Sequence, residues 1–201
     1  MIELRRFKVK RMRAMPKIVL DENIYRAAIQ IVIERGYSGA TTKQIADAAN
    51  ISEVTLFRKY GNKAQLIKQA IAAVTDQLDL QTAAAYTGDV AADLLRVVQL
   101  YQESAEEIGQ FIYTVLIEIP RHPELADSLD MPLGLIGRVG QLLARYQAEG
   151  VLIQEHRLHA VAALWGPLMV TNMIRSAAPA IAPPPIDLET HIAHFLDGRR
   201  L

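Results

Sequence analysis

The sequence predicts an all-α protein with a small helix-turn-helix head at its N-terminus and a larger helical bundle behind it. Apolar residues recur at helical spacing along most of the 201 residues, and no stretch combines strand-like alternation with hairpin turn pairs. Charge divides the chain in the same way. Residues 1–70 carry 14 Lys and Arg against 6 Asp and Glu, whereas residues 71–201 carry 8 against 16. A basic head on an acidic body indicates that the head meets a polyanion.

The composition also excludes several classes of protein. The chain has no cysteine, which rules out disulfides, thiolate catalysis and cysteine zinc sites and favours a reducing cytoplasm. The basic N-terminus is not followed by the apolar run of a signal peptide, and the longest strongly apolar run, residues 160–170, is too short to span a bilayer. We therefore expect a cytoplasmic protein without a membrane segment, a cofactor or a metal.

Residues 1–19 are expected to form a basic arm in front of the first helix. Its seven cations are opposed only by Glu3, and they are Arg5, Arg6, Lys8, Lys10, Arg11, Arg13 and Lys17. Such a segment is suited to lie along a minor groove or along phosphates. A disordered leader without function is the alternative.

The first two helices are delimited by their capping residues. Asp21 is the expected N-cap of the first helix, and Gly36 is its expected stop. Thr41 and Gln44 have the spacing of a capping box, so the second helix should begin at Thr42.

A tight turn and a third helix follow. Asn50 tolerates the left-handed conformation that such a turn needs, and Ser52 is the expected N-cap of the third helix. Leu56 and Tyr60 lie on one side of this helix and can pack inward. The remaining side chains point elsewhere, and they are Glu53, Val54, Thr55, Phe57, Arg58 and Lys59. A short helix with one anchored edge and a polar, partly basic outer face is typical of a DNA-reading helix.

The body is predicted to be a bundle of helices. Their expected ranges are Asn62 to about Ala85, Asp89 to Gly109, residues 111–119, Met131 to Glu149, Arg157 to Ser176 and Asp187 to Leu196. The chain is thereby divided into the arm (1–19), the helix-turn-helix domain (20–66) and a helical domain (67–201).

The stretch GYSGATTKQIADAANISEVTLFRKYGNKAQLI resembles the DNA-binding region of the TetR family of bacterial transcriptional regulators. The shared features are a first helix that ends in Gly plus an aromatic residue, a Thr-Thr start, the pair IA, the pattern S…TL, an aromatic residue and the pair NK. Two departures are evident. Asn50 stands where the family usually has Gly, and Phe57 stands where a tyrosine hydroxyl commonly bonds a phosphate.

The resemblance implies a role for each matching residue. Thr42, Lys43 and Lys63 would hold the DNA backbone at the starts of two helices, where free N–H groups favour phosphate. Base edges would be reached by Val54, Thr55 and Arg58, with Ser52 and Glu53 at the groove rim, Phe57 beside them and Lys59 on a phosphate.

The resemblance also implies a role for the body. The last two helices would form a homodimer with their copies, so that two heads read a near-palindromic operator on double-stranded DNA, and the regulator would be a repressor. A small apolar ligand would release it by favouring another dimer geometry. The candidate ligand residues are Tyr101, Phe111, Tyr113, Trp165, Met169 and Met173.

Two alternatives remain open from the sequence. The body could bind a protein partner and no small ligand, which a solid bundle centre would favour. The chain could instead be an all-α enzyme that uses helical carboxylates such as Glu103, Glu106 and Glu107. That reading requires a paired acidic site inside the bundle.

Overall fold

The computed structural model describes residues 16–76 and 80–201, and these residues are mostly helical. The α-helices are α1 (Pro16–Gly39), α2 (Thr42–Ala48), α3 (Glu53–Tyr60), α4 (Lys63–Thr75), α5 (Leu80–Ala83), α6 (Val90–Glu118), α7 (Asp130–Ala148), α8 (Arg157–Ala177) and α9 (Leu188–Asp197), and two 3₁₀ helices are η1 (Pro123–Leu129) and η2 (Pro179–Ile181). Across the described residues, extended backbone pairs only in an isolated bridge between Leu152 and Arg200. The predicted all-α class is confirmed.

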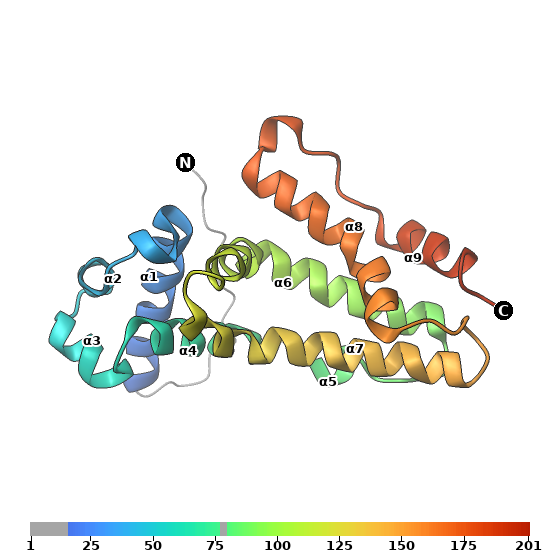
Figure 1. Ribbon diagram of the computed structural model, residues 1–201, viewed down its shortest axis with the longest axis horizontal. Helices are drawn as coiled ribbons and strands as arrows, with labels where there is room; N and C mark the ends of the chain where they lie inside the picture. The colour runs from blue at the N-terminus through green and yellow to red at the C-terminus, as the bar shows by residue number, and fades with distance from the viewer. Residues whose placement is uncertain (1–15, 77–79) are drawn as a thin grey trace.

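The helices form a head and an elongated body (Figure 1). α1 to α4 gather at one end of the molecule, while α6 and α7 extend away from them along the body. α8 packs on both α6 and α7, and α9 packs on α6. Within the two described stretches, no helix has the length and apolarity that a membrane span requires. Most of the predicted basic arm, residues 1–15, lies outside the described residues.

The first helix starts earlier than predicted. α1 begins at Pro16, so Asp21 lies inside the helix and does not cap it. The Asp21 carboxylate instead accepts a hydrogen bond from the Tyr60 hydroxyl at 3.0 Å and forms an ion pair with Lys59. A partner on a remote helix has therefore overridden the local capping preference of aspartate. Gly36 does interrupt the helix as predicted, with φ 70° and ψ 168°.

Two other predicted helices also differ. The helix expected to reach Ala85 ends at Thr75, and the two helices expected on either side of Gly109 are one continuous helix, α6. A glycine inside a helix costs only about 1 kcal/mol. α6 buries residues in both halves, from Leu94 near its start to Val115 near its end, and this burial outweighs the cost of Gly109.

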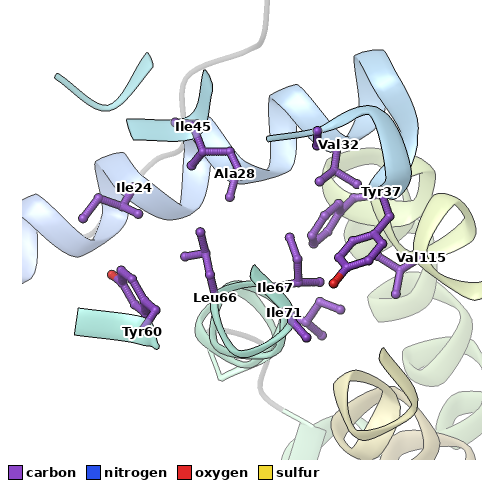
Figure 2. Close-up of a cluster of buried hydrophobic side chains, with 14 of the residues drawn as sticks. Ile24, Ala28, Val32, Tyr37, Ile45, Tyr60, Leu66, Ile67, Ile71 and Val115 are labelled. Atoms are coloured by element: carbon purple, nitrogen blue, oxygen red, sulfur yellow. The ribbon is translucent and has the colours of Figure 1, made fainter. Parts of the chain in front are cut away.

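The core of the head surrounds α4 (Figure 2). Ile24, Ala28 and Val32 of α1 form the buried stripe that faces this helix. The other labelled members of the cluster are Tyr37, Ile45, Tyr60, Leu66, Ile67, Ile71 and Val115. Val115 belongs to α6, and Phe111 of α6 is fully buried in the same cluster. The C-terminal half of α6 therefore shares the apolar core of the head, while the rest of the body has a second core of its own.

Polar contacts cross the same boundary. The Ser38 hydroxyl at the end of α1 donates to the Glu118 carboxylate at 3.1 Å, and its oxygen lies 2.8 Å from Nε2 of His122. The His122 ring meets the ring of Tyr37 edge-on, with centroids 4.9 Å apart. These contacts fix the end of α1 against the end of α6.

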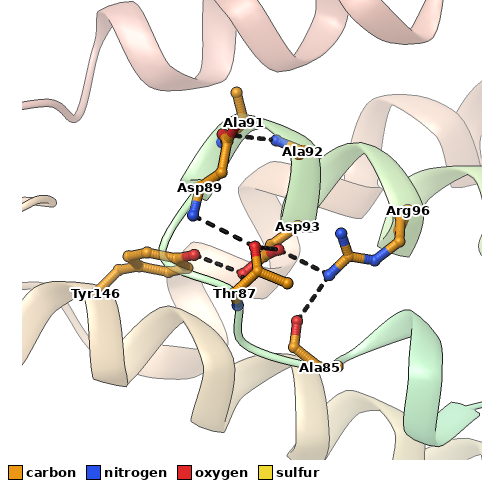
Figure 3. A network of polar contacts seen from close by, with 8 residues as sticks. All are labelled: Ala85, Thr87, Asp89, Ala91, Ala92, Asp93, Arg96 and Tyr146. Atoms are coloured by element: carbon orange, nitrogen blue, oxygen red, sulfur yellow. Dashed lines mark hydrogen bonds and ion pairs between the residues drawn. The ribbon is translucent and has the colours of Figure 1, made fainter.

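A buried aspartate organises the far end of the body (Figure 3). The Asp93 side chain has no solvent exposure and pairs with Arg96 at 2.7 Å. It accepts hydrogen bonds from the Thr87 backbone N–H at 2.8 Å, from the Thr87 hydroxyl at 2.5 Å and from the Tyr146 hydroxyl at 2.5 Å. Arg96 also donates to the Ala85 carbonyl at 2.8 Å. The network joins the loop before α6 to α7.

The hydrogen bonds to Asp93 keep its carboxylate ionised in spite of its burial. Burial alone would raise the pKa of Asp93, but the bonds from Thr87, Tyr146 and Arg96 outweigh burial and hold the pKa below its ordinary value. Burial and the bond to Asp93 together raise the pKa of Tyr146. Asp93 is therefore a charged, fully bonded group inside the bundle.

We expect Asp93→Ala to lower the free energy of unfolding by about 3 kcal/mol, because it leaves Arg96 and the Tyr146 hydroxyl without their partner. Asp89→Ala is the matched control, since it removes only the N-cap of α6 and should cost about 1 kcal/mol. Urea denaturation at neutral pH measures both values.

The pH dependence gives a second check on Asp93. A carboxylate whose pKa is lowered by folding stabilises the protein above its unfolded pKa of about 3.9, and this stabilisation is lost as the pH falls through the folded value. The difference between wild type and Asp93→Ala should therefore shrink below about pH 4. Equal losses for the Asp93 and Asp89 variants at neutral pH would contradict the assignment.

Candidate nucleic-acid interface

The start of α2 is fixed by the predicted capping box. The Gln44 backbone N–H donates to the Thr41 hydroxyl oxygen at 3.2 Å, and the Thr41 backbone N–H donates to the Gln44 side chain at 3.0 Å. Ile45 and Ala46 are buried and anchor α2 in the core of the head. The sequence prediction for this helix is confirmed.

The turn between α2 and α3 is also as predicted. Asn50 has φ 55°, and it is the one non-glycine residue with positive φ among the described residues. Ile51 packs partly buried against the head core, and its backbone N–H donates to the Ala46 carbonyl at 3.0 Å. Ser52 caps α3 by accepting from the Thr55 backbone N–H at 3.1 Å. These contacts set the angle between the two helices of a helix-turn-helix.

α3 has one anchored side and one open side. Leu56 and Tyr60 are buried, as predicted. On the open side Val54 is 76% exposed, Phe57 is 45% exposed and Arg58 is also exposed. The open side therefore combines two exposed apolar side chains with one cationic side chain.

Five side chains that were expected to contact DNA have partners inside the head. The Thr42 hydroxyl donates to the Glu53 carboxylate at 2.5 Å, and the hydroxyls of Ser52 and Thr55 share a hydrogen bond of 2.8 Å. Lys59 pairs with Asp21. The partners of Thr42 and Lys59 are distant in sequence, so residue type and helical periodicity alone could not identify them.

Lys63 was also expected to contact DNA, and it too has partners inside the head. Its ammonium group does not extend from the surface but donates to the backbone carbonyls of Tyr37 at 2.6 Å and Ala40 at 2.8 Å. Lys43 at the start of α2 is exposed, as expected for a phosphate contact. Lys43, Val54, Phe57 and Arg58 are expected DNA contacts whose side chains are exposed, and we call these four residues the reading face.

A family model described as bacterial regulatory proteins of the tetR family matches residues 24–70. These residues run from α1 into α4 and contain the whole helix-turn-helix. The helix-turn-helix segment of this chain is therefore similar to that of the TetR family.

The chain is also similar to proteins named as HTH-type transcriptional regulators. It is 34% identical over 102 residues to YvkB, an uncharacterised HTH-type transcriptional regulator of Bacillus subtilis, and the match covers 47% of each protein. It is 29% identical over 103 residues to the DNA-binding transcriptional repressor TetR of Mycobacteroides abscessus, covering 51% of this chain and 53% of the relative. The matched segment spans about half the length of these curated relatives.

Solved structures extend the likeness of fold to the body. A TetR family transcription regulator from Marinobacter aquaeolei superposes with a TM-score of 0.71 at 17% identity, over 92% of this chain and 99% of that chain. The flavonoid-responsive regulator FrrA superposes with a TM-score of 0.63 at 22% identity, over 90% and 97%.

The six candidate ligand residues of the body do not lie together. Phe111 is fully buried in the core of the head, and Met169 and Met173 are 44% and 48% exposed on the outside of α8. The six candidates therefore occupy different parts of the structure. Phe111 and Tyr113 are two residues apart on a helix, which directs them to different sides of α6.

The other three candidates meet between α6 and α8. The ring of Tyr101 stacks on Trp165 with centroids 5.3 Å apart, and the hydroxyls of Tyr101 and Tyr113 lie 2.9 Å apart. Burial, then the bond to Tyr113, raises the pKa of Tyr101. The indole N–H of Trp165 is buried without a hydrogen-bond partner among the described residues. A buried donor without a partner is rare and is available to a ligand that carries an acceptor.

Two polar residues beside this cluster were missed from the sequence. The amides of Gln102 on α6 and Asn172 on α8 exchange hydrogen bonds of 3.4 and 3.2 Å. A buried asparagine within an otherwise apolar helix was the available signal. A separate hollow of about 300 Å³ lies between the start of α6 and α9, bordered by Ala91 and Ile192 among others, and contains none of the predicted residues.

We expect Asn50→Ala to destabilise the protein by about 1 kcal/mol, because alanine adopts the left-handed conformation at a cost. Asn50→Gly should change the free energy of unfolding by less than about 0.5 kcal/mol. Asn23→Ala, at an exposed position inside α1, is the matched control and should be neutral or slightly stabilising. Chemical denaturation distinguishes the three variants, and an Asn50→Ala protein as stable as the glycine variant would contradict the role of the turn.

Proposed function

We propose that this protein reads a near-palindromic operator in the bacterial cytoplasm through α3 and that it acts there as a ligand-released repressor. The observation that carries the proposal is the reading face, where exposed apolar and cationic side chains stand on a helix whose angle is fixed by caps and by the Asn50 turn. The dimensions of an α-helix match the major groove.

The chemistry of the reading face suits base edges and phosphates. The Arg58 guanidinium can donate two hydrogen bonds to guanine, and Val54 can contact a thymine methyl group. Phe57 lies beside them and offers a further apolar surface. Lys43 is placed to neutralise a phosphate at the start of α2. The side chains of Thr42, Ser52, Glu53 and Thr55 take part through the internal bonds that shape this face.

A homodimer would bring two reading faces to one operator. The outer side of α8 exposes Leu158, Met169, Val170 and Met173, each by 44% to 50%. These residues recur at helical spacing, and an apolar stripe of this kind is typical of a subunit interface. A twofold dimer through α8 and α9 would place the heads in successive major grooves, about 34 Å apart.

The Tyr101, Tyr113 and Trp165 cluster is the place where a small ligand would act. Its stacked rings would hold a planar apolar molecule, and the free indole N–H would bind an acceptor on it. The structural relative FrrA is flavonoid-responsive by name, and flavonoids are planar aromatic molecules. Ligand binding between α6 and α8 would favour a dimer whose heads no longer fit adjacent grooves.

The reading face is tested by fluorescence anisotropy with duplexes enriched from a random pool. We expect Arg58→Ala to weaken binding to the enriched site by about 1–3 kcal/mol and to relax preference at one base pair. Lys43→Ala should weaken binding to all sequences and reduce the slope of log affinity against log salt by about 1.

Arg138→Ala is the matched control, because Arg138 is an exposed arginine of α7 on the body. It should leave both affinity and specificity unchanged. A pool that yields no enriched sequence, or equal effects of the Arg58 and Arg138 variants, would overturn the proposed function.

Ligand binding at this cluster can be followed by tryptophan fluorescence, because Trp165 is the only tryptophan in the chain. We expect a panel of planar aromatic compounds to contain molecules that quench Trp165 emission and release the operator at the same concentration. Tyr101→Ala should weaken both responses together, since it removes the stacked ring. Quenching without any change in operator affinity would argue against a role for this cluster in release.

A further inference from the structure

The ammonium group of Lys63 lies inside the head beside two backbone carbonyls and an aromatic ring. It donates to the Tyr37 carbonyl at 2.6 Å and to the Ala40 carbonyl at 2.8 Å, and it lies 3.9 Å from the centre of the Tyr37 ring. Tyr37 is itself buried, with 4% exposure. An ammonium group has three N–H donors, so two of the three are already used within the protein.

The two carbonyls need such a partner. They lie at the end of α1, just after the break at Gly36, where the last carbonyls of a helix lack partners from within the helix. A cation at this end of a helix is also favoured by the helix dipole. Lys63 therefore satisfies groups that would otherwise be left half-buried without a hydrogen bond.

The carbonyls that Lys63 binds lie next to the start of α2, while Lys63 itself lies at the start of α4. Ala40 directly precedes Thr41, the N-cap of α2, while Lys63 is the first residue of α4 and follows its N-cap Asn62. The two hydrogen bonds from Lys63 thus connect the start of α4 to the start of α2. Both starts are the points at which phosphates would meet the head.

We propose that Lys63 is a positioning residue of the DNA interface, which holds the start of α2 against the start of α4 and makes no phosphate contact of its own. This role rests on the proposed DNA binding and replaces the phosphate contact expected from the sequence. Burial lowers the pKa of Lys63, whereas the nearby carboxylates of Glu124 and Glu118 raise it. These acidic neighbours also make the site unfavourable for a phosphate.

The salt dependence of operator binding distinguishes a positioning role of Lys63 from a direct phosphate contact. A lysine that neutralises a phosphate contributes about 0.9 to the slope of log affinity against log salt, whereas a positioning residue contributes nothing to it. Lys63→Met keeps most of the stem and removes the donors and the charge. We expect it to reduce operator affinity about tenfold at every salt concentration, with an unchanged slope.

Lys43→Met is the matched comparison, because Lys43 is an exposed lysine at the start of α2. It should reduce the slope by about 0.9. A reduction of the same size for Lys63→Met would overturn the positioning role, and so would an affinity and a slope that both stay at the wild-type values.

Thermal unfolding without DNA gives a readout that does not depend on the proposed function. Lys63→Met should lower Tm by about 4 °C, while Lys43→Met should leave it unchanged. An unchanged Tm for the Lys63 variant would overturn the positioning role. If the lowered Tm is found but Lys43→Met and Arg58→Ala leave DNA binding unaffected, the proposed DNA reading fails and the link between α2 and α4 stands.

Lys63→Gln keeps an N–H donor without the charge and covers the case in which the methionine variant does not fold. A positioning role predicts a wild-type salt slope for this variant. A phosphate contact predicts the same loss of slope as in Lys43→Met.

Discussion

The packing of α1 against both α4 and the C-terminal half of α6 is the interaction on which the rest of the structure depends. Ile67 and Ile71 of α4 pack in the same cluster as Val115 of α6, so the core of the head is completed by a helix of the body. Without α6 the head would expose much of its apolar surface. The reading face is consequently held in a fixed relation to the bundle.

The parts of the fold that depend on near neighbours in sequence could be predicted. The capping box of Thr41 and Gln44, the left-handed Asn50 and the Ser52 cap each involve groups within three or four residues of one another, and residue type alone indicates them. The buried side of α3 followed from the spacing of Leu56 and Tyr60. The helix-turn-helix could therefore be recognised before any tertiary contact was known.

The parts that depend on distant partners could not be predicted. Asp21 has the residue type of a cap but bonds Tyr60, 39 positions away, and Lys63 has the residue type of a phosphate contact but bonds Tyr37 and Ala40. Local periodicity likewise could not show that Gly109 lies inside one continuous α6, because the packing that tolerates it comes from other helices. Nor could it separate Phe111, in the head core, from Tyr113, whose hydroxyl meets that of Tyr101.

Because α6 is one continuous helix, a small tilt at one end produces a larger displacement at the other end. Its 29 residues span about 43 Å, with the Asp93 network near one end and the shared core of the head near the other. A tilt of about 3° about the Asp93 end would move the far end by about 2 Å. A rotation small enough to preserve the packing of the body is thus large at the head, where a displacement of that size separates a formed hydrogen bond from a broken one.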